Sequence, residues 1–217
     1  MKVLIACEES QAVCSAFRKK GHEAFSCDII PCSGGYPEWH ILTDVKNIFD
    51  NSFQAFGQFW TEAGTVEPVI KKWDLIIAHP PCTYLANSGV QHLHKDKSRW
   101  DKLEKAIEFF MMFYNFDADK ICIENPVPHK YARLPKYNQI IQPYYFGHEV
   151  MKKTCLWLKN LPLLIPTNIV SQGKKYIGKN GKSNGSEWYQ LTTLKDRSKL
   201  RSKTFQGIAN AMAEQWG

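Results

Sequence analysis

The sequence predicts an α/β fold, in which helices cover both faces of a mainly parallel, doubly wound sheet. Short apolar runs of strand length alternate with amphipathic stretches of helix length along most of the chain. This alternation is typical of β-α-β units, whose successive strands run parallel. With 217 residues and a hydrophobic content of 44%, the chain can bury one sizeable core, so we expect residues 1–217 to form a single domain.

The first β-α-β unit begins at the N-terminus. Residues 2–7, KVLIAC, form an apolar run of strand length, and residues 22–30, HEAFSCDII, form a second one. Between them apolar residues recur at helical spacing, which predicts a helix that stops at Gly21. These apolar residues are Ala12, Val13, Ala16 and Phe17.

The same rhythm continues toward the C-terminus. It predicts four further strands and two further helices. The strands are WHILTDV (39–45), WDLIIAH (73–79), KICIEN (120–125) and TCLWLKN (154–160), and the helices are LEKAIEFFMMFYN (103–115) and QGIANAMAEQW (206–216).

Two regions break this rhythm. Residues 50–71 are aromatic and mixed without a clear period, and we expect a helical excursion there. Residues 171–187 combine Gly, Asn and Ser with four lysines, which predicts a mobile basic loop within the domain.

Charge and cysteine content exclude several classes of protein. The chain carries 28 Lys and Arg against 21 Asp and Glu, a net charge of +7, which favours anionic partners without naming one. No apolar run reaches membrane-spanning length and the chain opens directly into a strand, so we expect an intracellular protein without a membrane partner. Seven cysteines without a CxxC pair indicate free thiols rather than disulfides, and no metal site is expected.

Polar and reactive residues follow the predicted strands at their carboxyl ends. In an open parallel sheet these ends share one edge, and ligands bind there. We therefore expect the following residues to gather around one cleft: Cys7, Glu8, Glu9, Ser10, Asp28, Asp44, His79, Pro80, Pro81, Cys82, Glu124 and Asn125.

The acidic residues of this edge have two interpretations each. Asp28 can accept hydrogen bonds from a ribose or can cap a turn, and Asp44 can accept from an adenine amino group or can cap a helix. The loop ACEESQAV contains no glycine, and its carboxylates Glu8 and Glu9 would repel a phosphate. They suit a cationic ligand such as a sulfonium, which favours S-adenosylmethionine over a dinucleotide, or else they form a solvated helix start.

Cys82 and Glu124 are the pair of residues that indicates a specific chemistry most clearly. A thiol behind a rigid Pro-Pro turn has a fixed direction, and a carboxylate that ends the next sheet strand can face it. This pairing suits pyrimidine chemistry, in which a thiolate adds to carbon 6 and an acid stabilises the charge that develops at ring nitrogen 3. The alternative is a buried packing cysteine and a capped strand end.

Several stretches resemble DNA cytosine-5 methyltransferases, and the resemblance spans most of the chain. DLIIAHPPCTYL resembles their Pro-Cys motif and ICIENP their Glu-Asn motif, while HILTDV and QGIANAMAEQW are similar to the third-strand Asp motif and the C-terminal helix. The chain looks like the short phage and prophage members that lack a full target-recognition domain. The resemblance implies a Rossmann-like class I methyltransferase fold and S-adenosylmethionine as the cofactor.

The resemblance also implies a role for individual residues. Cys82 would be the nucleophile, with Pro81 as its orienting neighbour; Glu124 would engage ring nitrogen 3, and Asn125 would hold the loop. The cofactor would lie against residues 7–10, Asp28, Asp44 and Pro80. FGHEVMKKTCLW stands where the family has Gln-x-Arg-x-Arg, with Lys152 and Lys153 as substitutes that contact the substrate.

The first hypothesis is therefore a cytosine-5 methyltransferase-like enzyme that acts on a flipped base of DNA, in the cytoplasm of a bacterium or a phage-infected host. The second is an enzyme that uses the same Cys and Glu chemistry on a free pyrimidine nucleotide. The third is a non-catalytic DNA-binding protein that kept the fold. The lysines and arginines of residues 174–203 could bind DNA phosphates with little sequence selectivity or could form a solvated loop.

Overall fold

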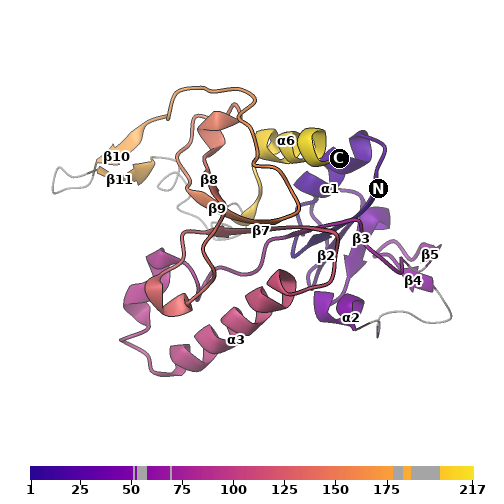
Figure 1. The fold of residues 1–217 in the computed structure, drawn as a ribbon, viewed down its shortest axis with the longest axis horizontal. Coiled ribbons are helices and arrows are strands. Elements are labelled where there is room, and N and C mark those ends of the chain that lie inside the picture. The colour runs from indigo at the N-terminus through magenta and orange to yellow at the C-terminus, as the bar shows by residue number, and fades with distance from the viewer. Residues whose placement is uncertain (51, 53–57, 69, 178–182, 187–200) are drawn as a thin grey trace.

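The computed structural model describes residues 1–50, 52, 58–68, 70–177, 183–186 and 201–217 (Figure 1). A seven-stranded sheet of order β3-β2-β1-β6-β7-β9-β8 forms its centre. The strands are β1 (Lys2–Ala6), β2 (Glu23–Asp28), β3 (His40–Leu42), β6 (Leu75–Ala78), β7 (Lys120–Pro126), β8 (Gln139–Ile141) and β9 (Thr154–Lys159).

The sheet is mainly parallel, as the alternation of strands and helices predicts. The pairs β2–β3, β1–β2, β1–β6 and β6–β7 are all parallel. Only β9 runs against its neighbours, pairing antiparallel with both β7 and β8. Strand β8 has no counterpart in the sequence-based prediction, because its three residues are too few to show a period.

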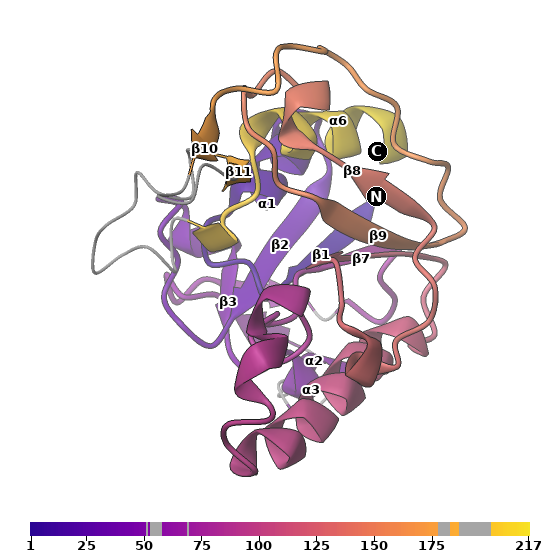
Figure 2. The same ribbon diagram turned by 90° about the vertical axis from the view of Figure 1, so that its left-hand side faces the viewer.

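Helices cover both faces of the sheet (Figures 1 and 2). Helices α1 (Ala12–Lys19) and α6 (Gln206–Trp216) lie on one face, while α2 (Val45–Phe49) and α3 (Ser98–Tyr114) lie on the other. Short 3-10 turns connect the elements: η1 (Pro37–Trp39), η2 (Asn87–His92), η3 (Lys130–Ala132) and η4 (Pro143–Tyr145).

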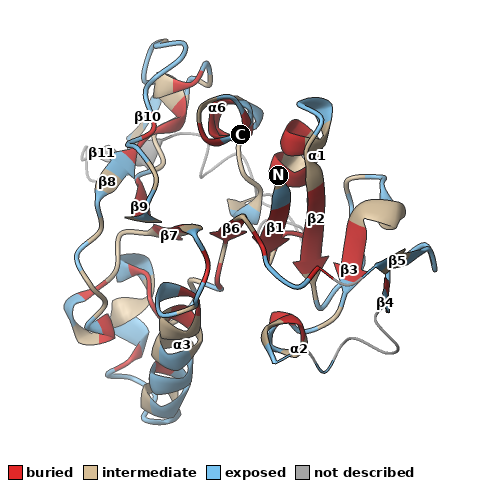
Figure 3. Cartoon of the chain, turned by 45° about the vertical axis from the view of Figure 1, so that its right-hand side comes forward, coloured by how far each residue is buried: buried red, intermediate tan, exposed pale blue. Residues whose placement is uncertain are grey.

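The hydrophobic core consists of two clusters, one on each face. In β1, Val3 and Ile5 pack with α1 and α6, while Leu4 and Ala6 pack with α2 and α3. Successive strand residues point to opposite faces, so a strand that is apolar throughout is buried on both sides. Figure 3 shows β1 and β2 buried along most of their length, and all four residues of β6 are buried.

Helix α3 begins five residues before the predicted start. Asp96 accepts hydrogen bonds from the backbone N–H and the hydroxyl of Ser98 at 2.9 and 2.7 Å, and so supports the first turn. A side chain of this type before a helix satisfies backbone donors that have no partner within the helix. The apolar stripe from Leu103 onward marks only the part of the helix that faces the core.

The helical excursion expected for residues 50–71 is wrong for the described residues. They form a two-stranded antiparallel ribbon of β4 (Gln58–Trp60) and β5 (Val66–Pro68). The turn closes with a hydrogen bond from Thr61 N to Thr65 O, and Gly64 adopts φ 77° there. Glycine takes this left-handed conformation without steric cost, which favours a hairpin turn over a continued helix.

Part of the segment predicted as a basic loop also forms strands. Strands β10 (Lys175–Ile177) and β11 (Ser183–Ser186), which the sequence did not predict, pair antiparallel within the segment 171–187. Residues 178–182 and 187 lie outside the described residues, and the mobility of the segment stays a prediction.

Within the described part of the chain, no helix has the length and apolar character needed to cross a membrane.

The start of α6 leaves no space for a side chain at Gly207. A Cβ atom placed there would lie 1.8 Å from the carbonyl oxygen of Phe146. We therefore expect Gly207→Ala to lower the free energy of unfolding by about 1–3 kcal/mol in urea denaturation, although alanine is the better helix former. Asn210→Ala, at an exposed position of the same helix, is the control and should change stability by less than about 0.5 kcal/mol. Equal stability of the two variants would contradict this packing.

Candidate active site

Strand register brings the predicted reactive residues to one edge of the sheet. Ala6 of β1 pairs with Ala78 of β6, which in turn pairs with Ile123 of β7. The next residue of each strand therefore lies in the same row: Cys7, His79 and Glu124. Because the three strands are parallel, their carboxyl ends open toward the same crevice.

A cleft of about 250 Å³ lies at this edge. Its walls come from the loop after β1, residues 7–10, from Asp28, and from His79, Pro81 and Cys82 after β6. Residues 202–204, just before α6, complete it. The structure thus brings together most of the predicted cofactor and catalytic residues, and it adds a segment for which the sequence showed only basic composition.

The loops that follow β6 and β7 are tied together by hydrogen bonds. Asn125 Nδ2, within β7, donates to the carbonyl oxygen of Pro80 at 2.7 Å. Further along, Asn87 N donates to Val127 O at 2.9 Å and His129 N to Leu85 O at 3.0 Å. These bonds fix the position of the turn that carries Cys82 relative to the end of β7.

His79 and Glu124 form a hydrogen-bonded pair at the cleft, in which His79 is one of the lining residues and Glu124 is not. His79 Nδ1 lies 2.8 Å from Glu124 Oε2, and the side chains are only 9% and 12% exposed. Burial alone would lower the pKa of His79, but the hydrogen bond and charge of Glu124, with the charge of Glu8, raise it above its ordinary value. Burial would raise the pKa of Glu124, but the bond from His79 and the charge of Lys152 hold it below its ordinary value.

Cys82 lies in the same cleft, partly buried. Burial and the negative charge of Glu124 raise the pKa of its thiol, while the positive charges of Lys152 and Arg201 lower it. The thiols of Cys122 and Cys155 are fully buried within β7 and β9, and burial raises the pKa of both. Cys82 is therefore better placed to react than either strand cysteine.

The first loop reaches the cleft without glycine. Cys7 and Gln11 take left-handed φ values of 59° and 57°, which non-glycine residues seldom adopt, so the loop still makes the turns that a glycine-rich loop would make. Glu8 accepts hydrogen bonds from Val13 N at 2.7 Å and Cys14 N at 3.1 Å, and so caps α1. Its carboxylate serves the helix start, but in a buried position rather than a solvated one.

Asp28 and Asp44 occupy different environments. Asp28 is half-buried in the cleft wall and accepts a hydrogen bond from Ile30 N at 3.3 Å; burial raises its pKa. Asp44 is exposed and caps α2, accepting from Lys46 N at 3.0 Å, and it is not among the residues that line the cleft. The geometry therefore favours a ligand role for Asp28 and a capping role for Asp44.

The two lysines predicted to contact the substrate also differ in their burial and in their position relative to the cleft. Lys152 is partly buried, donates from Nζ to the carbonyl oxygen of Arg201 at 3.0 Å, and its charge acts on Glu124, His79 and Cys82. Lys153 is exposed and does not line the cleft. Lys152 thus connects the reactive centre to the segment before α6.

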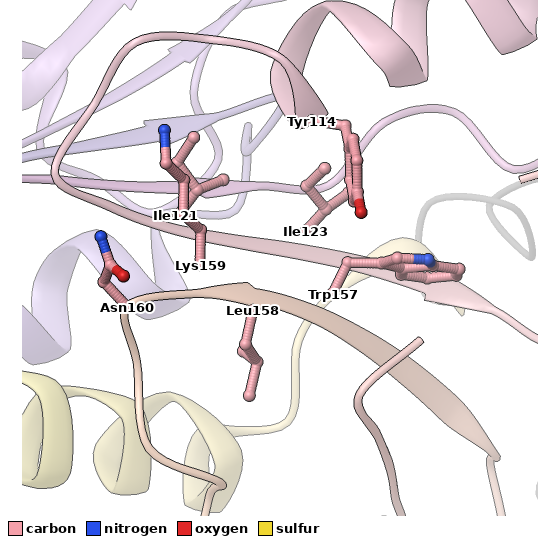
Figure 4. A pocket seen from close by; sticks show the side chains of 7 residues that line it. All are labelled: Tyr114, Ile121, Ile123, Trp157, Leu158, Lys159 and Asn160. Carbon is pink, nitrogen blue, oxygen red and sulfur yellow. The ribbon is translucent and has the colours of Figure 1, made fainter. Parts of the chain in front are cut away.

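A second cavity, of about 360 Å³, lies between α3 and the β7–β9 pair (Figure 4). Two of its polar side chains already have partners: Lys159 Nζ donates to Phe116 O at 3.2 Å and Asn160 Nδ2 to Asp119 O at 2.8 Å. Ile121, Ile123 and Trp157 supply apolar walls. Although this cavity is larger, it contains no pair of acid and nucleophile.

No cluster of three or more potential metal ligands occurs among the described residues.

No protein-family model matches the chain, and no curated protein matches it. Among solved structures, the chain is similar to an E. coli prophage-encoded protein described as a candidate DNA modification methyltransferase. The TM-score is 0.47 at 12% sequence identity, over 79% of this chain. This chain spans about half of that structure's chain, 52%.

Glu8 predicts a pH dependence of stability. Burial, the largest cause, raises its pKa from 4.5 to about 7, against the opposing effects of His79 and the two backbone hydrogen bonds. Between these two pKa values the folded protein binds more protons than the unfolded chain, so the free energy of unfolding falls as pH rises. We expect this fall, on the order of 3 kcal/mol at most, to shrink in Glu8→Gln when denaturation is measured across that range.

The exposed Glu108 on α3 supplies the control, and Glu108→Gln should retain the wild-type pH dependence. An unchanged pH dependence in Glu8→Gln would show that Glu8 is ionised in the folded protein throughout this range.

Proposed function

We propose that this protein is an S-adenosylmethionine-dependent enzyme of the DNA cytosine-5 methyltransferase type, with Cys82 as its nucleophile. One observation carries the proposal: the adjacent parallel strands β6 and β7 bring Cys82 into the cleft and Glu124 against His79 of the cleft wall. A hydrogen bond from Asn125 of β7 to Pro80 joins this strand to the turn that carries Cys82. The sheet supports the same assignment. Its first five strands follow the Rossmann order, and β9 enters antiparallel beyond them, so we assign a Rossmann-like class I methyltransferase fold.

The chemistry follows from a thiolate and an acid on the two sides of a pyrimidine ring. Cys82 Sγ forms a bond to carbon 6, and the electrons of the 5,6 double bond move toward carbon 5 and the ring nitrogen-carbonyl system. A proton from the Glu124 carboxyl to nitrogen 3 stabilises this charge. Once carbon 5 carries the methyl group, its proton passes to water, the electrons of that C–H bond restore the 5,6 double bond, and the bond to Cys82 Sγ breaks with its electrons leaving on sulfur. The proton on nitrogen 3 then returns to Glu124. A flipped base is required, because the stack of a duplex hides carbon 6.

The cleft fits a cationic nucleoside cofactor. Asp28 can accept from ribose hydroxyls beside the apolar side chain of Ile30, and the acidic residues 8 and 9 make the loop after β1 unfavourable for a phosphate. S-adenosylmethionine would supply the methyl group. The backbone of residues 7–10 and the carboxylate of Asp28 would hold it, with Pro80 buried behind the turn.

The thiol of Cys82 requires nearby positive charge to ionise. Burial and Glu124 raise its pKa, whereas Lys152 and Arg201 favour the thiolate. An added positive charge in the cleft would favour it further, because opposite charges at short range stabilise an ion that burial disfavours. This electrostatic balance favours nucleophilic attack when a cationic cofactor is bound.

DNA is the proposed partner. Lys203 lines the cleft and Lys152 lies beside it, so positive charge borders the reactive centre where a phosphate backbone would pass. A free pyrimidine nucleotide is the second candidate substrate, favoured by the small volume of the cleft and by the short stretch between β9 and α6, which leaves little chain for a recognition domain.

Covalent trapping tests the nucleophile. A fluorine at carbon 5 blocks the final proton loss, so DNA that carries 5-fluorocytosine should remain bound to Cys82 in a denaturing gel when S-adenosylmethionine is present. Cys82→Ala should abolish the adduct, and Glu124→Gln should slow its formation by about 100-fold, the scale of one acid contribution. Cys32→Ser, at a partly exposed cysteine outside the cleft, serves as the matched control and should form the adduct normally.

Two outcomes of this experiment would refute the assignment: an adduct that maps to Cys7 or another cysteine, or full methyl transfer by Cys82→Ala. Reaction with 5-fluoro-dCMP but not with DNA would instead identify a nucleotide-modifying enzyme with the same chemistry.

Calorimetry tests the cofactor cleft. We expect S-adenosylmethionine or its demethylated product to bind, and Asp28→Ala to weaken binding by about 1–3 kcal/mol through the loss of hydrogen bonds to a charged acceptor. Asp117→Ala, an exposed position just after α3, should bind as the wild type does. Absence of heat and of a thermal shift at millimolar ligand would remove the cofactor assignment.

A further inference from the structure

His79 has an unusual position for a strand-end residue. Its backbone N–H donates to Ala6 O at 2.9 Å, which extends the β1–β6 pairing by one residue, and its ring lines the cleft. Nδ1 lies 2.8 Å from Glu124 Oε2. The other ring nitrogen, Nε2, is buried and has no hydrogen-bond partner among the described residues. The only hydrogen bond of the His79 ring among the described residues is therefore the one with the Glu124 carboxylate.

This arrangement has an energetic cost that packing does not explain. Removing two charges from water costs several kcal/mol for each ion, and their attraction repays this only when the geometry is good. Apolar residues at both positions 79 and 124 would avoid the cost. A histidine whose single polar contact is the proposed acid of the site points to a role in the charge and orientation of that acid.

We propose that His79 is the positioning residue for Glu124 and carries the proton that Glu124 delivers to ring nitrogen 3 of the pyrimidine. This inference rests on the proposed function, since it concerns the same acid. A carboxylate cannot donate a hydrogen bond, yet nitrogen 3 of cytosine is an acceptor. The acid must therefore obtain a proton, and the nearest one is held by the imidazole ring.

The proton balance of the pair is simple. With the cleft empty, the proton is on Nδ1 and Glu124 is a carboxylate. When nitrogen 3 approaches, the N–H bond at Nδ1 breaks and an O–H bond forms on Glu124, which leaves both partners neutral. As the bond between Cys82 Sγ and carbon 6 forms, the proton passes to nitrogen 3, and it returns to the pair when that bond breaks.

Charged groups from three other elements act on His79. Glu124 lies at the end of β7, Glu8 in the loop after β1, and Lys152 just before β9. The two carboxylates favour the protonated ring and Lys152 opposes it, with the net result that the pKa of His79 is raised. These charges and the contact with Glu124 therefore favour the protonated form of the ring over that of an unperturbed imidazole.

Nuclear magnetic resonance of the free protein tests the pair without any assumption about the reaction. In protein labelled with ¹⁵N-histidine, His79 should show two protonated ring nitrogens at about pH 7, above the ordinary histidine pKa. In Glu124→Gln the same ring should become neutral at lower pH. A neutral His79 ring at this pH in the wild type would overturn the inference.

Kinetics of the 5-fluorocytosine adduct test the delivery of the proton. In His79→Asn the amide nitrogen can take the place of Nδ1 and donate to Glu124, but it has no proton to transfer. We expect the adduct rate to fall by about 100-fold with DNA affinity retained, and the optimum to move to acidic pH, where solvent protonates Glu124. His22→Asn, near the N-terminus and outside the cleft, is the control and should keep the wild-type rate.

The outcomes separate the two proposals. Wild-type reactivity together with an unchanged rate and pH profile in His79→Asn would overturn the role of His79 and leave Cys82 as the nucleophile. No adduct with the wild-type protein would overturn the proposed function and the proton delivery with it, while the resonance measurement would still decide whether His79 and Glu124 share a proton.

Discussion

The parallel pairing of β6 with β7 is the constraint on which the site depends. Its register places Ala78 beside Ile123, so the residues that follow, His79 and Glu124, meet at the same edge. Both strands are buried on both faces, which makes this register costly to change, because a shift of one residue would move every apolar side chain to the opposite face. The most rigid part of the molecule thus orients the most reactive one.

Electrostatics divide the cleft into two parts. Near β1 and β2 the wall is acidic, with Glu8, Glu9 and Asp28, and it favours a cationic ligand. Near β9 and the start of α6 the charges of Lys152 and Lys203 favour an anionic one. The proposed methyl donor and nucleic acid carry these opposite charges, which matches the division of charge around the cleft.

Local sequence patterns account for most of the fold and for the members of the site. Apolar runs such as residues 75–78 and the stripe in α3 are long enough to show a period, and each corresponds to an element of the structure. The two-stranded ribbon at residues 58–68 was missed because its turn is set by one Thr–Thr backbone bond and the conformation of Gly64. Neither feature leaves a periodic signal.

The sequence by itself determined the α/β class and which thiol and carboxylate end neighbouring strands, because alternation, prolines and strand ends are local properties. Only the tertiary structure decided the roles within the cleft. It made Glu8 a buried helix cap, put Asp44 on α2 outside the cleft wall, and joined His79 to Glu124 across 45 positions of sequence. Hydrogen bonds and buried charges of this kind depend on distances in space, which sequence spacing does not encode.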